Sequence, residues 1–295
     1  MLGAGCTPSP PPGVPTAPLP TTVATDRELA DRVPYQLRNR GVLDIGTDPP
    51  YRPMEYLTSD GRLTGVDVHL AQAIAAKLHL AAAFSLEAFS ALTTGVRVGR
   101  FDLGVAALSV SPGESLPVDA VLYLESGTRL VRSATSDAEL DDLCGRAVGA
   151  LEGSAQVADL AAASIACTDA GREPITVRAA GTVEEVARGV LLGNAEALVA
   201  DSPVAQSIAR DYPAELEVTG DVGSPRPLAM LIDPAVPGLA DLVADALDAL
   251  IADGSYDAIL AAEGVVEGAA ARAFVLRAGD TFDVSPLTTR TAGSG

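Results

Sequence analysis

Two kinds of hydrophobic pattern alternate along the chain from residue 41 onward. Residues 42–47 and 101–108 form short apolar runs that are typical of buried strands. Between them, apolar residues recur at every fourth position, as they do along one face of a helix: Leu70, Ile74 and Leu78. A second helix is predicted over residues 89–98. Strands that alternate with helices in this order predict an α/β fold with a largely parallel sheet.

The same pattern begins again after residue 127. Three further strands are predicted: 147–151, 175–177 and 197–200. Thr182 and Glu185 have the spacing of a capping box, which marks the start of one of the helices between these strands. Residues 239–250 carry apolar positions with helical spacing. We therefore expect two α/β units, with a last helical region after the second.

The two ends of the chain have a different composition. Residues 7–25 are rich in proline and uncharged, which predicts an extended, polyproline-like spacer. Residues 2–5 before Cys6 resemble the cleavage site of a bacterial lipoprotein, although a glycine stands where leucine is usual. We expect a signal segment and a lipid on Cys6 that anchors an extracytoplasmic protein to the membrane; the alternative is a lone tail cysteine. Residues 269–295 carry a small apolar patch at 273–276, and most of this tail is expected to be poorly ordered.

Charge and composition exclude several classes of function. The chain has 20 Lys and Arg residues against 39 Asp and Glu residues, a formal net charge of −19, and a surface this negative repels nucleic acid. No run approaches the ~18 apolar residues of a membrane-spanning helix. With two histidines and three cysteines, there is little material for a zinc site or a Ser-His-Asp triad, so we expect no metal and no cofactor.

A series of short motifs resembles, in order, the family 3 extracellular solute-binding proteins, which are the amino-acid receptors of bacterial ABC importers. The similarity covers about residues 30–265. The motifs lie at residues 46–56, 60–61, 63–68, 99–103, 118–119, 141–145, 153–154, 200–205 and 252–256. The resemblance implies a monomer that binds a small molecule and delivers it to an ABC permease in the membrane.

The resemblance also implies the domain organisation. Two α/β lobes are joined by two hinge strands, and the ligand lies in the cleft between the lobes. The hinges are expected near residues 126–128 and 225–227, and the lobes are expected to close around the ligand. The chain then divides as follows: 1–40 N-terminus and linker, 41–126 plus 226–268 lobe 1, 127–225 lobe 2, and 269–295 tail.

Residue by residue, the resemblance implies a set of ligand-binding positions. Asp201 would accept hydrogen bonds from a ligand ammonium, and Tyr51 and Phe89 would form aromatic walls. The helix that starts at Ser154 would offer amides and a hydroxyl to an anion. The full set is Asp48, Tyr51, Phe89, Ala107, Leu108, Ser109, Glu114, Ser154 and Asp201. The alternatives are a helix cap for Asp201, a turn for Asp48 and core packing for Phe89.

At one position the sequence departs from the family pattern. Glu114 stands where the family has an arginine that binds the α-carboxylate of the ligand. Because a carboxylate there repels a carboxylate, we expect weak binding of ordinary amino acids and a preference for a cationic amine. The alternative is that Glu114 points to solvent. A second hypothesis is an enzyme similar to cyclohexadienyl dehydratase, with Glu114 and Glu152 as acids. Against it, this chain lacks the arginine that would bind the carboxylate of the substrate.

Two of the three cysteines are predicted to form a disulfide. Free thiols outside the cytoplasm tend to pair, and a bond between Cys144 and Cys167 closes a loop worth about 3 kcal/mol of stability. Similar cysteine pairs occur in some members of the family. The alternative is two unconnected small core residues.

Overall fold

The computed structural model describes residues 13–265, 267–283 and 287. The strands are β1 Val42–Thr47, β2 Tyr56–Leu57, β3 Leu63–Thr64, β4 Ala81–Leu86, β5 Leu103–Ser109, β6 Asp119–Ser133, β7 Ala147–Leu151, β8 Thr176–Ala180, β9 Ala197–Asp201, β10 Leu216–Ile232 and β11 Ala269–Leu276. The helices are α1 Arg27–Arg32, α2 Tyr35–Arg40, α3 Val66–Lys77, α4 Phe89–Arg97, α5 Ala155–Asp169, α6 Val183–Leu191, α7 Ser202–Asp211, α8 Leu239–Ala252 and α9 Ser255–Ala262. Cys6, with its predicted lipid, lies outside the described residues.

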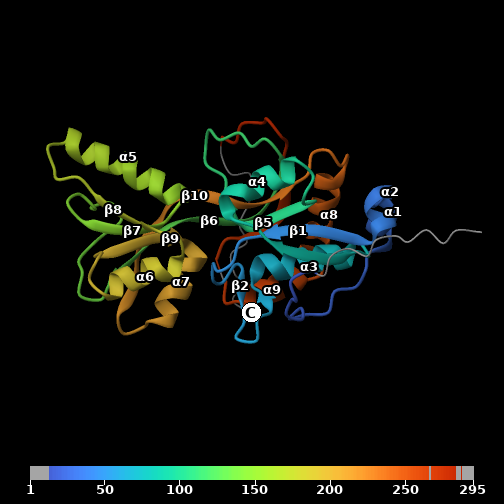
Figure 1. Cartoon of the computed structure of the whole chain (residues 1–295), viewed down its shortest axis with the longest axis horizontal. Helices are drawn as coiled ribbons and strands as arrows, with labels where there is room; N and C mark the ends of the chain where they lie inside the picture. Colours follow the sequence, from blue (N-terminus) through green and yellow to red (C-terminus); the bar gives the residue numbers. More distant parts are fainter. Residues whose placement is uncertain (1–12, 266, 284–286, 288–295) are drawn as a thin grey trace, which may run out of the picture.

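One curved sheet runs through the whole molecule and carries two lobes (Figure 1). Its strand order is β4-β1-β5-β10-β6-β9-β7-β8, and β11 pairs with β6. The outer strands of each lobe pair in parallel, whereas β10 and β6 pair antiparallel to each other and to the strand on either side. The predicted α/β class and the two-lobed arrangement are therefore confirmed.

The long strands β6 and β10 pass from one lobe to the other side by side. Ser126 pairs with Arg226, and Thr128 pairs with Gly223, so the predicted crossing points lie opposite each other in this ladder. The register shifts on both sides of Gly223, which interrupts the regular hydrogen bonding between the strands there.

Lobe 1 is built around α3, which packs against the sheet, α8 and α9. Ten of its twelve residues are buried, because helices cover the side of α3 that faces away from the sheet. A helix that is enclosed in this way loses the usual polar face. The charged residue Asp67 in its first turn is also buried and serves the site described below.

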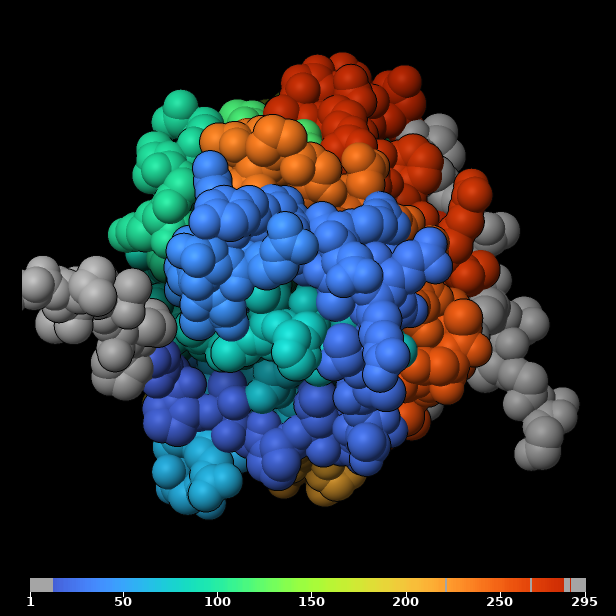
Figure 2. Space-filling model, turned by 90° about the vertical axis from the view of Figure 1, so that its right-hand side faces the viewer, coloured from blue at the N-terminus to red at the C-terminus, as the bar shows by residue number. Residues whose placement is uncertain are grey.

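The N-terminal segment is not a free spacer. Extended backbone over residues 13–26 hydrogen-bonds to lobe 1: Val14 N donates to Phe84 O (2.9 Å), Ala17 N to Leu63 O (2.8 Å) and Asp26 N to Lys77 O (2.9 Å). Figure 2 views the outer end of this lobe, where α1 and α2 (blue) lie against the rest of the lobe, close to α8 (orange). Residues 13–40 are thus part of the folded unit.

The expectation for the C-terminal tail was wrong for the residues that the structure describes there. Residues 269–276 form β11, which adds a strand beside β6. Phe282 and Leu287 are buried in a cluster of apolar side chains that also contains Leu276. The sequence analysis missed this strand because its apolar patch is short and lies beyond the family motifs.

The predicted disulfide between Cys144 and Cys167 is present, with the two Cα atoms 5.6 Å apart. It ties the loop before β7 to α5. Among the helices that the structure describes, none combines the length and the apolar character needed to cross a membrane.

Candidate functional site

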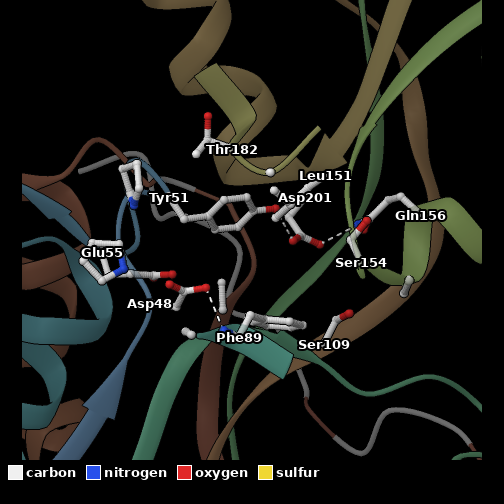
Figure 3. Close-up of a pocket in the computed structure, with 16 residues that line it drawn as sticks. Asp48, Tyr51, Glu55, Phe89, Ser109, Leu151, Ser154, Gln156, Thr182 and Asp201 are labelled. Carbon is white, nitrogen blue, oxygen red and sulfur yellow. Dashed lines mark hydrogen bonds between the residues drawn. The ribbon is translucent and has the colours of Figure 1, made fainter. Parts of the chain in front are cut away.

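A cavity of about 140 Å³ lies in the cleft between the two lobes (Figure 3). This volume is close to the ~150 Å³ of cavities that take up a benzene-sized molecule. Lobe 1 contributes the loop after β1, the start of α4 and the end of β5; lobe 2 contributes the ends of β7 and β9 and the starts of α5 and α6. The lining residues are Asp48, Pro49, Pro50, Tyr51, Glu55, Phe89, Ala106, Ala107, Ser109, Leu151, Ser154, Ala155, Gln156, Gly181, Thr182 and Asp201.

Seven of the nine ligand-binding positions expected from the sequence line this cavity. They are Asp48, Tyr51, Phe89, Ala107, Ser109, Ser154 and Asp201. Leu108 does not line it, because successive side chains of a strand point to opposite faces and this one packs beside a lobe 1 core cluster. Glu114 does not line it either: its Oε2 accepts a hydrogen bond from its own loop, from Ser111 N (2.8 Å).

A hydrogen bond between the lobes crosses the cavity. Tyr51 Oη of lobe 1 donates to Asp201 Oδ2 of lobe 2 over 2.7 Å, and Gln156 Nε2 donates to Asp201 Oδ1 over 3.0 Å. Asp201 is only 5% exposed. Burial raises the pKa of its carboxyl group, while the bonds from Tyr51 and Gln156 act in the opposite direction. The carboxylate is therefore held in place by one donor from each lobe.

The structure does not support the helix-cap alternative for Asp201. It precedes α7 at the N-cap position, but its side chain makes no capping hydrogen bond. Both oxygens instead take part in the network of the cleft. The start of α7 has Pro203 in its first turn, where a missing N–H costs little.

The side chain of Asp48 is hydrogen-bonded to the backbone of Phe89. Asp48 Oδ2 accepts a hydrogen bond from Phe89 N, the first residue of α4, over 2.8 Å. A carboxylate at this end of a helix is stabilised by the unpaired N–H groups there. Burial raises the pKa of Asp48, and the bond from Phe89 N lowers it in part. The alternative that Asp48 only forms a turn therefore does not describe its full role. Its carboxylate both binds the first N–H of α4 and faces the cavity.

Glu55 and Asp67 form a second pair of neighbouring acids at the cleft. Glu55 is 1% exposed and lines the cavity, and its Oε2 has no hydrogen-bond partner among the described residues. Burial, followed by the nearby Asp67 carboxylate, raises the pKa of Glu55 well above its usual value. Burial likewise raises the pKa of Asp67 to about 6. A proton is therefore retained in this pair at pH values where exposed carboxyl groups are ionised.

Asp67 holds the backbone of the cavity wall in an unusual conformation. Its Oδ2 accepts a hydrogen bond from Ala107 N (2.6 Å), and Oδ1 accepts one from Tyr123 Oη. Ala107 has φ = 45°, in the left-handed region that non-glycine residues seldom adopt. The bond from a buried acid offsets that strain and fixes the end of β5 where Ser109 meets the cleft.

The loop that carries Tyr51 and Glu55 is fixed by the start of α3. Val66 N donates to Pro53 O (3.0 Å) and Asp67 N donates to Met54 O (2.9 Å). This contact requires Gly65, which has φ = 118° and where a Cβ would lie 2.3 Å from Met54 O. The helix and the site loop are thus positioned by the same few backbone bonds.

A sequence model of the bacterial extracellular solute-binding proteins, family 3, matches residues 43–262. The chain belongs to this family. It is 31% identical over 244 residues to the arginine-binding protein ArgT of Corynebacterium glutamicum, which covers 82% of this chain and 80% of that protein.

Solved structures of related proteins have the same fold. An ancestral arginine-binding protein bound to arginine superposes with a TM-score of 0.68 at 27% identity, covering 76% of this chain and 99% of that one. An ancestral amino-acid-binding protein, described as a precursor of cyclohexadienyl dehydratase, superposes with a TM-score of 0.65 at 24% identity over 77% and 97% of the two chains. At that identity the second likeness concerns the fold alone.

The sequence analysis missed several residues of this solute-binding protein's cleft. Gln156 and Glu55 supply polar atoms, whereas Leu151 supplies an apolar wall. Thr182 was identified only as a helix cap, and its Oγ1 does accept a bond from Glu185 N. Glu55, Gln156 and Thr182 each lie within a few residues of an expected site residue or a helix start. Neither spacing nor composition, however, identifies them as residues that line the cleft.

A larger cavity of about 610 Å³ lies in lobe 2, between α5 and the hinge strands. Two of the three acids that line it are already paired: Glu139 binds Arg132, and Asp159 forms a two-bond ion pair with Arg226 (2.7 Å for each), whereas the third, Asp141, is exposed. It contains no aromatic side chain among its lining residues. The cleft, with unpaired acid atoms and two aromatic rings, is the better candidate for ligand binding.

We predict that Asp67→Asn changes how stability depends on pH. The folded pKa of Asp67 is about 6, above the ordinary value of 3.8, so the folded state binds more protons between those values. Wild-type stability should therefore fall, relative to the variant, by up to about 3 kcal/mol as pH rises from 4 to 6. Urea denaturation at several pH values measures this difference. Parallel stability profiles of the two proteins across that range would contradict the prediction.

Proposed function

We propose that this solute-binding protein captures a small organic cation, with a guanidinium or ammonium group, for an ABC permease. One observation carries the proposal. Every charged residue that lines the cleft cavity is acidic, and the described lining has no lysine, arginine or histidine: Asp48, Glu55 and Asp201. A cationic ligand supplies the charge that this buried group of acids lacks.

The proposed roles follow from the chemistry of each side chain. Asp201 and Asp48 bind cationic groups of the ligand through charge-assisted hydrogen bonds. The rings of Tyr51 and Phe89 provide faces over which a cation gains about 0.5–2 kcal/mol. Ser109, Thr182 and Gln156 are available to orient the ligand. The relative ArgT is an arginine-binding protein, which agrees with a cationic ligand.

The finer proposal is that the preferred ligand carries no α-carboxylate. Arg226 is a buried cation at the hinge, but its two terminal nitrogens both bind Asp159. Glu114 stands where the family has its carboxylate-binding arginine. The N-terminus of α5, where Ser154 Oγ has no hydrogen-bond partner among the described residues, can accept a neutral acceptor group of the ligand.

The remaining expectations complete the proposal. The protein acts as an extracytoplasmic monomer, tethered to the membrane by a lipid on Cys6. Lobe 1 comprises residues 41–126 and 226–268, and lobe 2 comprises residues 127–225. Because residues 13–26 bind along lobe 1, the tether would reach the membrane from that lobe.

An enzyme similar to cyclohexadienyl dehydratase is the second hypothesis. The fold is shared with an ancestral precursor of that enzyme. The cavity disfavours it, because its described lining offers no cation for the carboxylates of such a substrate. Glu152 is exposed and outside the lining, and Glu114 is bonded within its own loop.

Agmatine, which is arginine without its carboxylate, should bind more tightly than arginine itself. Glutamine and glutamate should not bind measurably, since each carries an α-carboxylate and neither has a net positive charge. Asp201→Asn should weaken agmatine binding at least tenfold, which corresponds to about 1.4 kcal/mol for a charge-assisted hydrogen bond. Isothermal titration calorimetry measures these affinities, with Asp60→Asn in the exposed β2–β3 turn as the matched control. Tight binding of glutamate or glutamine would sink the proposal.

Glu114→Arg should shift the preference of the cleft toward ligands with a carboxylate. Replacing −1 by +1 five residues after the cavity-lining Ser109 should raise the affinity for arginine relative to agmatine by tenfold or more. Glu114→Gln, which removes the repulsion without adding a cation, should have a smaller effect in the same direction. If both variants leave the ratio of the two affinities unchanged, position 114 does not recognise the ligand.

Incubation with prephenate or arogenate should yield no product above the uncatalysed rate. The physical reason is the absence of a carboxylate-binding cation from the described lining. Absorbance of the aromatic product follows the reaction. Turnover that is abolished by Asp201→Asn would replace the binding-protein proposal with the enzyme.

A further inference from the structure

The segment after β11 runs along the loop that connects β5 to β6. We call residues 277–282 the C-terminal strap and residues 110–116 the cleft loop. Their backbones are joined by three hydrogen bonds: Gly279 N to Leu116 O (2.9 Å), Phe282 N to Glu114 O (2.9 Å) and Gly113 N to Phe282 O (2.6 Å). The start of the strap is held by Asp119, which accepts from Ala278 N (2.9 Å) and Arg277 Nη1 (3.1 Å).

Phe282 is the side chain that fixes the strap. It is 3% exposed and belongs to the same apolar cluster as Val110 and Leu116 of the cleft loop. Burial of an aromatic side chain of this size is worth about 1.5–3 kcal/mol. The strap is therefore packed as a part of the core rather than resting on its surface.

The cleft loop depends on the strap for its backbone contacts. Among the described residues, the backbone hydrogen bonds from residues 111–117 to any other segment all go to the strap. The preceding residue, Val110, donates from its N to Pro227 O at the hinge (3.0 Å), and Ser109 before it lines the cavity. The loop thus links the strap to both the ligand cavity and the hinge.

The strap lies outside the part of the chain that matches the family model, which ends at residue 262. The cleft loop, in contrast, lies inside the match and carries Glu114. An additional segment of this chain is therefore bonded to the loop in which the family places its carboxylate-binding arginine.

We propose that the C-terminal strap is a positioning element for ligand binding and that Phe282 is its positioning residue. This inference rests on the proposed function of the cleft. The strap keeps the cleft loop, and with it Ser109 and the Val110–Pro227 contact, in the ligand-ready arrangement before the ligand arrives. Without the strap, ligand binding must order the loop, and the conformational entropy lost in that step reduces the affinity.

The test compares three variants of the full chain. In Phe282→Ala, hydrogen exchange of the Val110 amide in the ligand-free protein should become at least tenfold faster, and the affinity for agmatine should fall at least tenfold. Phe282→Leu should restore most of both values. Leu276→Ala, in the same apolar cluster but on β11, is the matched control: it should lower stability without changing either quantity at temperatures well below unfolding.

Each outcome decides the matter. Unchanged exchange at Val110 in Phe282→Ala overturns the inference, as does faster exchange with unchanged agmatine affinity. Equal losses in Leu276→Ala and Phe282→Ala also overturn it, because they would show a general effect of stability. If wild type does not bind agmatine or arginine, the proposed function of the cleft fails, and the exchange measurement alone decides whether the strap holds the loop.

Discussion

The buried carboxylate of Asp201 is the constraint on which the arrangement of the cleft depends. A charge between two lobes is unfavourable unless donors compensate it, and here one donor comes from each lobe: Tyr51 and Gln156. The carboxylate of Asp201, which connects the lobes, is therefore also the group proposed to bind the ligand. A ligand cation would compensate the charge more fully than a phenol does, so ligand binding and contact between the lobes depend on one group.

The four acids at the cleft form two pairs, and burial raises the pKa of each acid. Asp48 and Asp201 face the cavity and are bonded to a backbone N–H or to polar side chains. Glu55 also lines the cavity, whereas its neighbour Asp67 does not, and the Asp67 carboxylate adds to the effect of burial in raising the pKa of Glu55. A proton retained between Glu55 and Asp67 reduces the repulsion among these four neighbouring acids. Asp67 also has a structural role, because its bond from Ala107 N holds that residue in its left-handed conformation.

Local patterns in the sequence predicted most of the two lobes, because periodicity and caps report short-range structure. The predicted helix cap at Thr182 is present, and Leu70 and Ile74 of the predicted helical stripe are buried in α3. Of the cavity lining, the sequence analysis named seven residues but not Gln156 or Glu55. Glu55 lies inside a family motif, yet the contacts of these two side chains with Asp201 and Asp67 arise only in the fold. The terminal segments were misjudged for the same reason: composition describes residues 13–26 as extended, but only the fold supplies the backbone partners at Leu63 and Phe84.

Both ends of the described chain are bound to lobe 1, and this makes the two lobes unequal. Lobe 2 is held by its own disulfide and joins lobe 1 through β6 and β10. The ladder between these strands is interrupted on both sides of Gly223, and at Gly127 a Cβ would lie 2.3 Å from Val222 Cγ1. Few backbone bonds resist a change of angle at this point, whereas the strap and the N-terminal segment add bonds to lobe 1. A motion between the lobes would therefore be concentrated at the hinge, where the Val110–Pro227 hydrogen bond connects it to the cleft loop.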